Sequence, residues 1–218
     1  MFTLNAVEGG VCAARGFYAD GIAIGLKKEN AKDLAFIYSD TVCQNASVFT
    51  TNKMTAAPIR HFRQKGDFQG NFVLINAKNA NAMTGNAGIA DIDEVLGALI
   101  EKFPQIQHPV MSSTGVIGVR LPKAKIIEGA MTFDLTHREG VAASEAIMTT
   151  DTFAKRIAFE VILEDGRSFR MGAMAKGAGM INPAMATMLC FITTDALVES
   201  ATMQILLDEC VHTTFNAA

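Results

Sequence analysis

The sequence predicts a fold of mixed α and β structure. Short runs rich in β-branched or aromatic residues alternate along the chain with longer stretches whose apolar residues recur at helical spacing. Half of the 218 residues are hydrophobic and 19% are charged, which provides a sizeable core and disfavours disorder. A chain of this length forms one large domain or two small ones.

Three strands are predicted in the first half of the chain, at Leu34–Tyr38, Ser47–Thr50 and Phe72–Asn76. Each run is rich in β-branched or aromatic residues and is bounded by polar or turn residues. We therefore expect these segments to contribute to one or more sheets.

Two helices are predicted in the middle of the chain. The first covers Ile89–Phe103, where the large apolar residues share one face. Asp91, with Glu94 three residues later, resembles a capping box near its start. The second helix opens at Pro122, because proline is tolerated in the first helical turn.

The last third of the chain is predicted to form a hairpin, a strand and a helix. The hairpin covers residues 155–177, and its arms alternate around Asp165-Gly166, a dipeptide typical of a type I′ turn. A buried strand is expected over residues 188–196. A helix is expected over residues 201–215, with three side chains on one side: Met203, Leu207 and Cys210.

The composition argues against several classes of protein. A formal net charge of -3 is not that of a nucleic-acid-binding domain, and no apolar run approaches the ~20 residues that span a bilayer. The first residues do not have the pattern of a signal peptide. Four scattered cysteines and four separate histidines lack the close spacing of a metal site. We expect a cytoplasmic protein without a metal.

Four polar segments could carry chemistry, and each also has an ordinary structural interpretation. Lys176 in a glycine-rich turn could hold an anion, although a loop between strands is the more common role. Segment 111–118, MSSTGVIG, could stabilise an oxyanion through a backbone N–H and a hydroxyl, although a β-turn with glycine at positive φ is at least as common. The asparagine-rich segment 76–88 is more often a tight loop than a pocket, and the threonines of segment 148–152 more often cap a helix.

Thr187 is a hydroxyl in an apolar run. A threonine hydroxyl is a weak nucleophile unless a base lies beside it. Cutting the Ala186–Thr187 bond would turn the threonine's own α-amino group into that base, with an ordinary pKa of about 7.7–8.0. Considered alone, an Ala-Thr pair in an apolar strand is far more often part of a core.

Six blocks in order change this assessment, because together they resemble the ornithine acetyltransferase (glutamate N-acetyltransferase) family of arginine biosynthesis. The resemblance runs from about Gly9 to Asn216. The blocks are GGVCAARGF, SVFTTNKMTAAPI, INAKNANAMTGNAG, SSTGVIG, AIMTTDT and KGAGMINPAMATML.

The resemblance implies a mixed α/β sandwich, shared with certain self-processing aminopeptidases, and a set of roles. The chain would cut itself at Ala186–Thr187 into an α-chain region, 1–186, and the start of a β chain, 187–218. Thr187 would then carry the acetyl group from N-acetylornithine to glutamate. Thr114 and Gly115 match the oxyanion hole, and Thr150 (with Thr149 less favoured), Lys176 and Thr187 match substrate-binding positions.

Partners and donors also follow from the resemblance. The α and β chains of family members stay together, which implies a heterotetramer of two of each. No bound cofactor is expected, and acetyl-CoA is accepted as a donor by some members. The family polypeptide continues beyond Asn216, so the 187–218 region is expected to be truncated. At Asn182–Ala184 the chain has alanine after the proline, where many relatives have asparagine.

Two other functions remain open at the level of sequence. A self-processing amidohydrolase or aminopeptidase on the same scaffold would release its product to water instead of to glutamate. A truncated chain could also fold without activity.

Overall fold

The computed structural model describes residues 1–177 and 188–215. In these residues the strands form two four-stranded sheets. The central sheet has the order β2-β3-β4-β5 and the outer sheet has the order β1-β6-β7-β8. All neighbouring strands are antiparallel except β4 and β5, which are parallel. The strand bounds are β1 Phe2–Ala6, β2 Phe17–Ile22, β3 Leu34–Cys43, β4 Gly70–Asn76, β5 Val110–Ser113, β6 Lys155–Leu163, β7 Ser168–Lys176 and β8 Leu189–Thr194.

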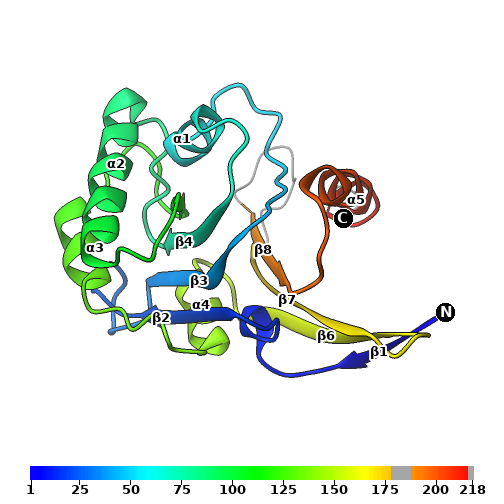
Figure 1. Cartoon of the computed structure of the whole chain (residues 1–218). Helices are drawn as coiled ribbons and strands as arrows, with labels where there is room; N and C mark the ends of the chain where they lie inside the picture. The colour runs from blue at the N-terminus through cyan, green and yellow to red at the C-terminus, as the bar shows by residue number, and fades with distance from the viewer. Residues whose placement is uncertain (178–187, 216–218) are drawn as a thin grey trace.

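The helices are distributed unevenly around the two sheets (Figure 1). Helices α1, α2 and α3 cover one face of the central sheet, and α4 with the short 3-10 helix η1 lies on its other face, towards the outer sheet. Helix α5 stands apart, beyond β8. The bounds are η1 Gly10–Cys12, α1 Ala57–Gln64, α2 Gly85–Lys102, α3 Lys123–Ala130, α4 Gly140–Ala146 and α5 Ser200–Thr213.

The central sheet lies between two hydrophobic cores. Side chains alternate along β3, so that Leu34 and Phe36 enter the core under α1–α3 while Ala35 and Ile37 enter the core beside α4. Phe36 is fully buried and packs between the rings of Phe72 and Phe133, with centroid distances of 5.9 and 4.7 Å. The continuous apolar sequence of β3 follows from burial on both faces.

The outer sheet is packed on one face only. Met174 of β7 joins the core beside α4, and a Cβ at Gly172 would overlap the Gly10 carbonyl of η1. The residues on the opposite face include Ile157 and Ile192, which are 54% and 51% exposed. The backbones of β7 and η1 therefore meet directly at Gly172, because glycine has no side chain in the way.

Most of the predicted elements are confirmed, and two predictions about the first half are wrong. Segment Ser47–Thr50 forms no strand, although its first residue is held by hydrogen bonds to Gln204 of α5. Helix α2 begins at Gly85, earlier than predicted, so Asp91 lies inside it and does not cap it. Asp91 is instead buried and binds Arg120.

Two predictions about the second half are also corrected. The β6–β7 hairpin forms, but Gly166 alone of the turn dipeptide has a positive φ, 82°, and its N–H donates to Leu163. A type I′ turn needs a positive φ at both central residues, so the connection is a longer loop with a left-handed glycine. Strand β8 and helix α5 form as predicted, but β8 is only partly buried and none of the residues of α5 is buried.

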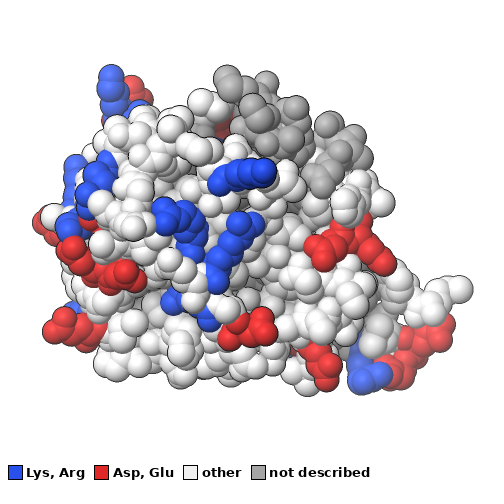
Figure 2. All heavy atoms as spheres, turned by 90° about the horizontal axis from the view of Figure 1, so that it is seen from above, with Lys and Arg blue, Asp and Glu red and all other residues white. Residues whose placement is uncertain are grey.

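Charged side chains are not spread evenly over the surface. Figure 2, which views the molecule from above, shows lysine and arginine side chains gathered near the middle and left of this face, with aspartate and glutamate mainly towards its edges. Among the described residues, no helix is long and apolar enough to cross a membrane. In the same residues, no three His, Cys, Asp or Glu side chains gather as a metal site.

Candidate active site

The carboxyl ends of β4 and β5 place Thr114 and Gly115 beside the asparagine-rich loop. Because these two strands are parallel, their carboxyl ends lie at the same edge of the central sheet. The Thr114 N–H donates to the Asn76 carbonyl (3.0 Å), and the Ser113 hydroxyl donates to the Asn76 side-chain oxygen (2.6 Å). Thr114 is 1% exposed, so its hydroxyl faces the protein interior.

Gly115 occupies a position that no other residue fits. Its φ is 132°, and a Cβ there would overlap the Lys78 carbonyl group and lie 2.7 Å from the Asn79 nitrogen. The next residue, Val116, donates its N–H to the Lys78 carbonyl (2.9 Å). Glycine is therefore required for the backbone to pass this closely.

Lys176, the last residue of β7, joins the two sheets at this point. It is 5% exposed, and its Nζ donates to Thr114 Oγ1 (3.1 Å) and to Thr149 Oγ1 (2.7 Å). Burial lowers the pKa of Lys176; the charge of Asp151 opposes this fall, and the charge of Lys155 adds to it. A buried ammonium with two hydroxyl neighbours is a place where a substrate carboxylate or carbonyl oxygen can bind.

The segment after α4 brings Thr149, and not Thr150, to this lysine. Thr149 is half-buried and contacts Lys176, whereas Thr150 is exposed. The sequence favoured Thr150 for a substrate role, with Thr149 as the second choice. Both threonines lie in a bend after α4, and the backbone there directs the Thr149 hydroxyl to Lys176.

Asp151 is a site residue that sequence reasoning missed. Its carboxylate is 1% exposed and accepts hydrogen bonds from Lys155 Nζ (2.8 Å), the Gly177 N–H (2.8 Å) and the Thr149 N–H (3.2 Å). Burial alone would raise the pKa of Asp151, but these hydrogen bonds outweigh it and lower the pKa to about 2. The available signal was an acidic residue directly after two threonines in the MTTDT block.

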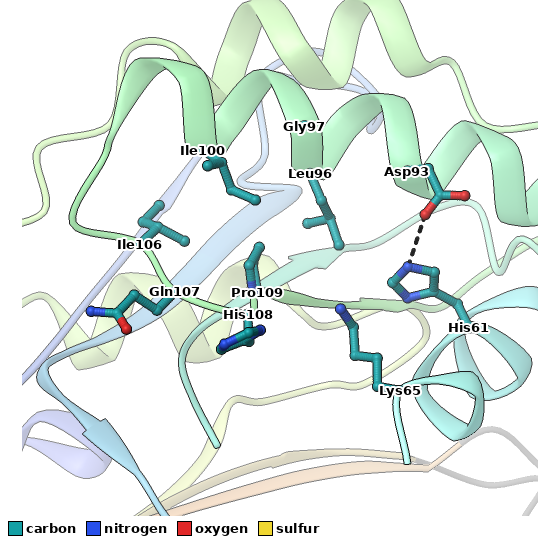
Figure 3. A pocket seen from close by; sticks show the side chains of 10 residues that line it. All are labelled: His61, Lys65, Asp93, Leu96, Gly97, Ile100, Ile106, Gln107, His108 and Pro109. Atoms are coloured by element: carbon teal, nitrogen blue, oxygen red, sulfur yellow. Dashed lines mark hydrogen bonds and ion pairs between the residues drawn. The ribbon is translucent and has the colours of Figure 1, made fainter. Parts of the chain in front are cut away.

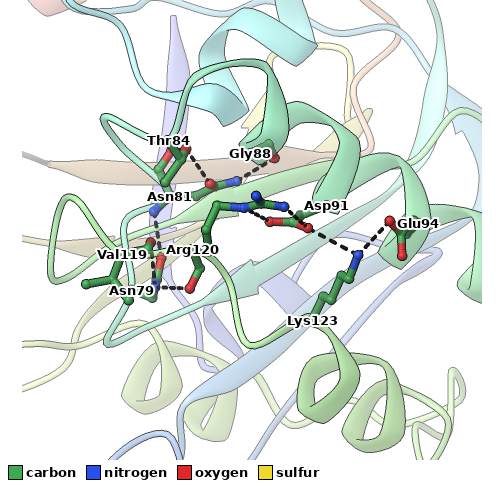
Figure 4. Close-up of polar contacts among 9 residues, drawn as sticks. All are labelled: Asn79, Asn81, Thr84, Gly88, Asp91, Glu94, Val119, Arg120 and Lys123. Atoms are coloured by element: carbon green, nitrogen blue, oxygen red, sulfur yellow. Dashed lines mark hydrogen bonds and ion pairs between the residues drawn. The ribbon is translucent and has the colours of Figure 1, made fainter.

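The asparagine-rich loop is a structural support, as the more common interpretation of segment 76–88 predicted (Figure 4). Asn79 Nδ2 donates to the carbonyls of Val119 (3.0 Å) and Arg120 (3.1 Å), and Asn81 Nδ2 donates to the Gly88 carbonyl (2.9 Å). These bonds tie the loop after β4 to the loop that follows Gly115, and so fix the backbone around Thr114.

An ion pair between α2 and the loop before α3 strengthens this support. Arg120 donates from Nε and Nη2 to the two oxygens of Asp91, at 2.6 Å each, and Lys123 lies 3.4 Å from the same carboxylate (Figure 4). The Arg120 hydrogen bonds hold the pKa of Asp91 below its usual value. The bidentate geometry fixes both the distance and the orientation of the loop.

Among the hollows of the described surface are one beside α1 and α2 and one that borders the site. It has a volume of about 490 Å³, and Thr149 lines it together with Lys27, Lys32 and Glu145. Lys27 Nζ donates to the Ala146 carbonyl (3.0 Å), at the end of α4. The threonine that contacts Lys176 thus also faces an open recess.

The other hollow, about 450 Å³, lies between α1, α2 and the loop before β5 (Figure 3). His61 lines it and pairs with Asp93 at 3.2 Å, a partner that the sequence did not indicate. Burial lowers the pKa of His61. This hollow reaches Pro109, at the amino end of β5, whereas Thr114 follows the carboxyl end, so the two places are separate.

The predicted nucleophile and cleavage site, Thr187 and Ala186, lie outside the described residues. The structure nevertheless places Leu189 opposite Lys176 in the β7–β8 pair. The structure brings Lys176 to Thr114, which Gly115 follows in the chain, and gives no hydrogen bond from the described residues between Thr150 and either Lys176 or Thr114.

These features define a class of protein: an α/β fold of two sheets, with a buried lysine held between threonine hydroxyls where the sheets meet. Within that class, the chain belongs to the ArgJ family, whose model matches residues 18–218. The resemblance found in the sequence is thereby confirmed.

Two curated relatives carry the name arginine biosynthesis bifunctional protein ArgJ. The protein from Wolinella succinogenes is 60% identical over 218 residues, which are 100% of this chain and 55% of the relative. The protein from Dehalococcoides mccartyi is 45% identical over 213 residues, 96% of this chain and 52% of the relative. The chain spans about half the length of the curated relatives it matches.

Two solved structures share the fold. The arginine biosynthesis bifunctional protein from Bacillus halodurans superposes with a TM-score of 0.77 at 33% identity, covering 87% of this chain and 100% of that chain. Ornithine acetyltransferase complexed with ornithine, from Mycobacterium tuberculosis, gives 0.71 at 32% identity, covering 86% of this chain and 100% of that chain. The predicted mixed α/β fold class is confirmed by these neighbours.

Proposed function

We propose that this chain is part of an acetyltransferase of arginine biosynthesis that moves the acetyl group of N-acetylornithine to glutamate. Membership of the ArgJ family supports this, as does a structural neighbour that is an ornithine acetyltransferase complexed with ornithine. The observation in this chain that carries the proposal is the buried Lys176 ammonium, between the hydroxyls of Thr114 and Thr149.

In the proposed reaction Thr187 is the nucleophile. Its hydroxyl oxygen attacks the acetyl carbonyl, its own α-amino group takes the hydroxyl proton, and the C–N bond to ornithine breaks as the ornithine amine leaves with that proton. The amine of glutamate then attacks the acetyl-Thr187 ester, which forms N-acetylglutamate and restores the hydroxyl. Thr114 and Gly115 are proposed to stabilise the negative oxygen in both steps. Lys176, with Thr150 and Thr149 as candidates beside it, is proposed to bind a substrate carboxylate.

We propose that the free α-amino group arises from self-cleavage at Ala186–Thr187, which separates region 1–186 from region 187–218. The lengths of the relatives support a cut of this kind. The chain covers about half of the curated relatives, yet 87% and 86% of it cover the two solved chains completely. The solved chains are therefore much shorter than the curated sequences. The proposed product is an assembly of two α and two β chains.

Intact-mass measurement of the purified protein tests the cleavage. We expect two species, one ending at Ala186 and one beginning at Thr187, and a single uncut species for Thr187→Ala. Thr187→Ser is the matched control, since it keeps the hydroxyl and should still be cut. A single uncut mass for the wild type would exclude self-processing of this chain.

Acetyl transfer is tested separately, by following release of ornithine from N-acetylornithine with and without glutamate. Dependence on glutamate supports the acetyltransferase, whereas equal release to water supports an amidohydrolase on the same scaffold. The relatives are named bifunctional, which favours a second donor for this enzyme. Acetyl-CoA is the proposed one, and formation of N-acetylglutamate from acetyl-CoA and glutamate tests it.

A further inference from the structure

One buried carboxylate, that of Asp151, is not used by the proposed reaction and contacts three segments near Lys176. Asp151 accepts hydrogen bonds from Thr149 in its own loop, from Lys155 at the start of β6 and from the N–H of Gly177 directly after β7. A buried carboxylate costs free energy unless it is paired and hydrogen-bonded, and here both conditions are met.

We propose that Asp151 is the positioning residue of this site: its carboxylate fixes the end of β7 against the loop after α4, and thereby holds the Lys176 ammonium between Thr114 and Thr149. The catalytic meaning of this role depends on the proposed function of Lys176. The role itself concerns only the geometry and charge of the described residues.

The covalent chain shows why the contact controls Lys176. Asp151 binds the residue immediately after Lys176, so movement of one displaces the other. It also binds the N–H of Thr149, whose hydroxyl accepts from Lys176 at 2.7 Å. The same carboxylate thus sets the position of the donor and of one acceptor. Gly177 has a φ of 149°, in the region that favours glycine, so its N–H orientation is also specified by the sequence.

The charges around Lys176 explain why a carboxylate is needed at this place. Burial and the nearby Lys155 both disfavour a charged Lys176, and Asp151 is the group that favours it. Lys27, from the loop after β2, is a third cation that interacts with Lys176. Thr114 and Thr149 contribute hydroxyls but no charge. Asp33 is a second carboxylate whose charge acts on Lys27, but Asp151 is the carboxylate whose charge favours a charged Lys176.

The test is a titration of the Lys176 side chain by NMR, following its 13Cε and 15Nζ resonances in the substrate-free protein. The resonances are assigned by their loss in Lys176→Met. In Asp151→Asn, which keeps the shape and removes the charge, we expect the pKa of Lys176 to fall by about one unit relative to wild type. In Lys155→Met, which removes a repelling charge, we expect it to rise.

The sign of the pKa shift in Asp151→Asn distinguishes two cases: a carboxylate whose charge holds the Lys176 ammonium in place, and a side chain whose loss only loosens the structure. If Asp151→Asn only loosened the structure, water would reach Lys176 and its pKa would rise towards the ordinary value in both variants. An unchanged or raised pKa in Asp151→Asn therefore overturns the proposal. Asp165→Asn, in the β6–β7 turn, is the matched control and should leave the pKa of Lys176 unchanged. Circular dichroism identifies any variant that does not fold, and Asp151→Ser, which also removes the charge and should also lower the pKa of Lys176, provides the second measurement if Asp151→Asn is one of them.

The titration also separates this proposal from the proposed function. It needs neither substrate nor self-cleavage, so loss of acetyl transfer in the wild type does not affect it. If the pKa of Lys176 falls as expected while the wild-type protein transfers no acetyl group, Asp151 keeps its role and the proposed function fails.

Discussion

The central sheet is covered on both faces, whereas the outer sheet is covered on one, and each sheet provides one half of the site. Thr114 directly follows β5 of the central sheet and is 1% exposed, and Gly115 comes next in the chain. Lys176 ends β7 of the outer sheet, whose opposite face exposes large apolar side chains such as Ile157 and Ile192. The oxyanion candidates are thus held by a packed core, while the lysine depends on specific polar contacts.

This difference predicts how the two halves of the site respond to amino-acid substitution. Packing fixes the central sheet through many weak contacts, and a single substitution removes only a part of them. Beyond its pairing with β6 and β8, the end of β7 is held at the site by a few hydrogen bonds, those of Lys176 and Gly177, so one substitution can remove a large share of them. Regions with few buried apolar contacts open more easily than core strands.

The largest expected effect is in the central sheet. Phe36→Ala removes a fully buried ring that packs against Phe72 and Phe133. We expect the free energy of unfolding to fall by about 3–5 kcal/mol, from lost burial and the cavity left behind. Urea unfolding followed by circular dichroism measures it. A loss below about 1 kcal/mol would contradict the view of this sheet as the main core.

A smaller, pH-dependent effect is expected at the junction between the sheets. The pKa of Asp151 is about 2 in the folded protein and near 3.8 in the unfolded chain. The ionised Asp151 therefore stabilises the folded protein above about pH 4, and this stabilisation is lost as the pH falls through 2. Between pH 4 and pH 2, the free energy of unfolding should fall by about 2 kcal/mol more for wild type than for Asp151→Asn. Urea unfolding at several acidic pH values checks this, and parallel curves for the two proteins would refute it.

The smallest effect is expected on the face of the outer sheet that points away from the core. Ile157→Ala should change the free energy of unfolding of this chain by less than about 1 kcal/mol, because the side chain is half exposed. Ile75→Ala is the matched control in the central sheet, where Ile75 is buried, and should cost about 2–5 kcal/mol. Equal falls in the free energy of unfolding of the two variants would show that the central sheet is not more tightly packed than the outer sheet.

The sequence predicted local elements better than it predicted contacts between them. The apolar runs of β3 and β4 and the helical spacing of α2 are local signals, and those elements form. Asp91 looked like a cap because its partner, Arg120, is distant in sequence and only the fold brings them together. Ser47–Thr50 has the composition of a strand, but no neighbouring strand offers it a hydrogen-bonding edge among the described residues.

The same reasoning applies to the site. The motifs of Gly115 and Lys176 marked them as candidates, but the residues alone left an ordinary turn or loop at least as common, and the family resemblance supplied their roles. Which of Thr149 and Thr150 faces Lys176 depends on the direction in which the chain leaves α4, which composition does not reveal. Asp151 was missed because the sequence alone does not distinguish an aspartate that is buried in the fold from one that stays in solvent.

Strands β7 and β8 should stay paired if the chain between them is cut. Six residue pairs join the strands, from Met171 with Thr194 to Lys176 with Leu189. Asp195 accepts hydrogen bonds from the backbone of Arg15 and Arg170, and α5 holds Ser47 through Gln204. A nick in the connection would leave these contacts unchanged. The fragments would migrate as two bands after denaturation, yet would elute as one particle from a sizing column under native conditions.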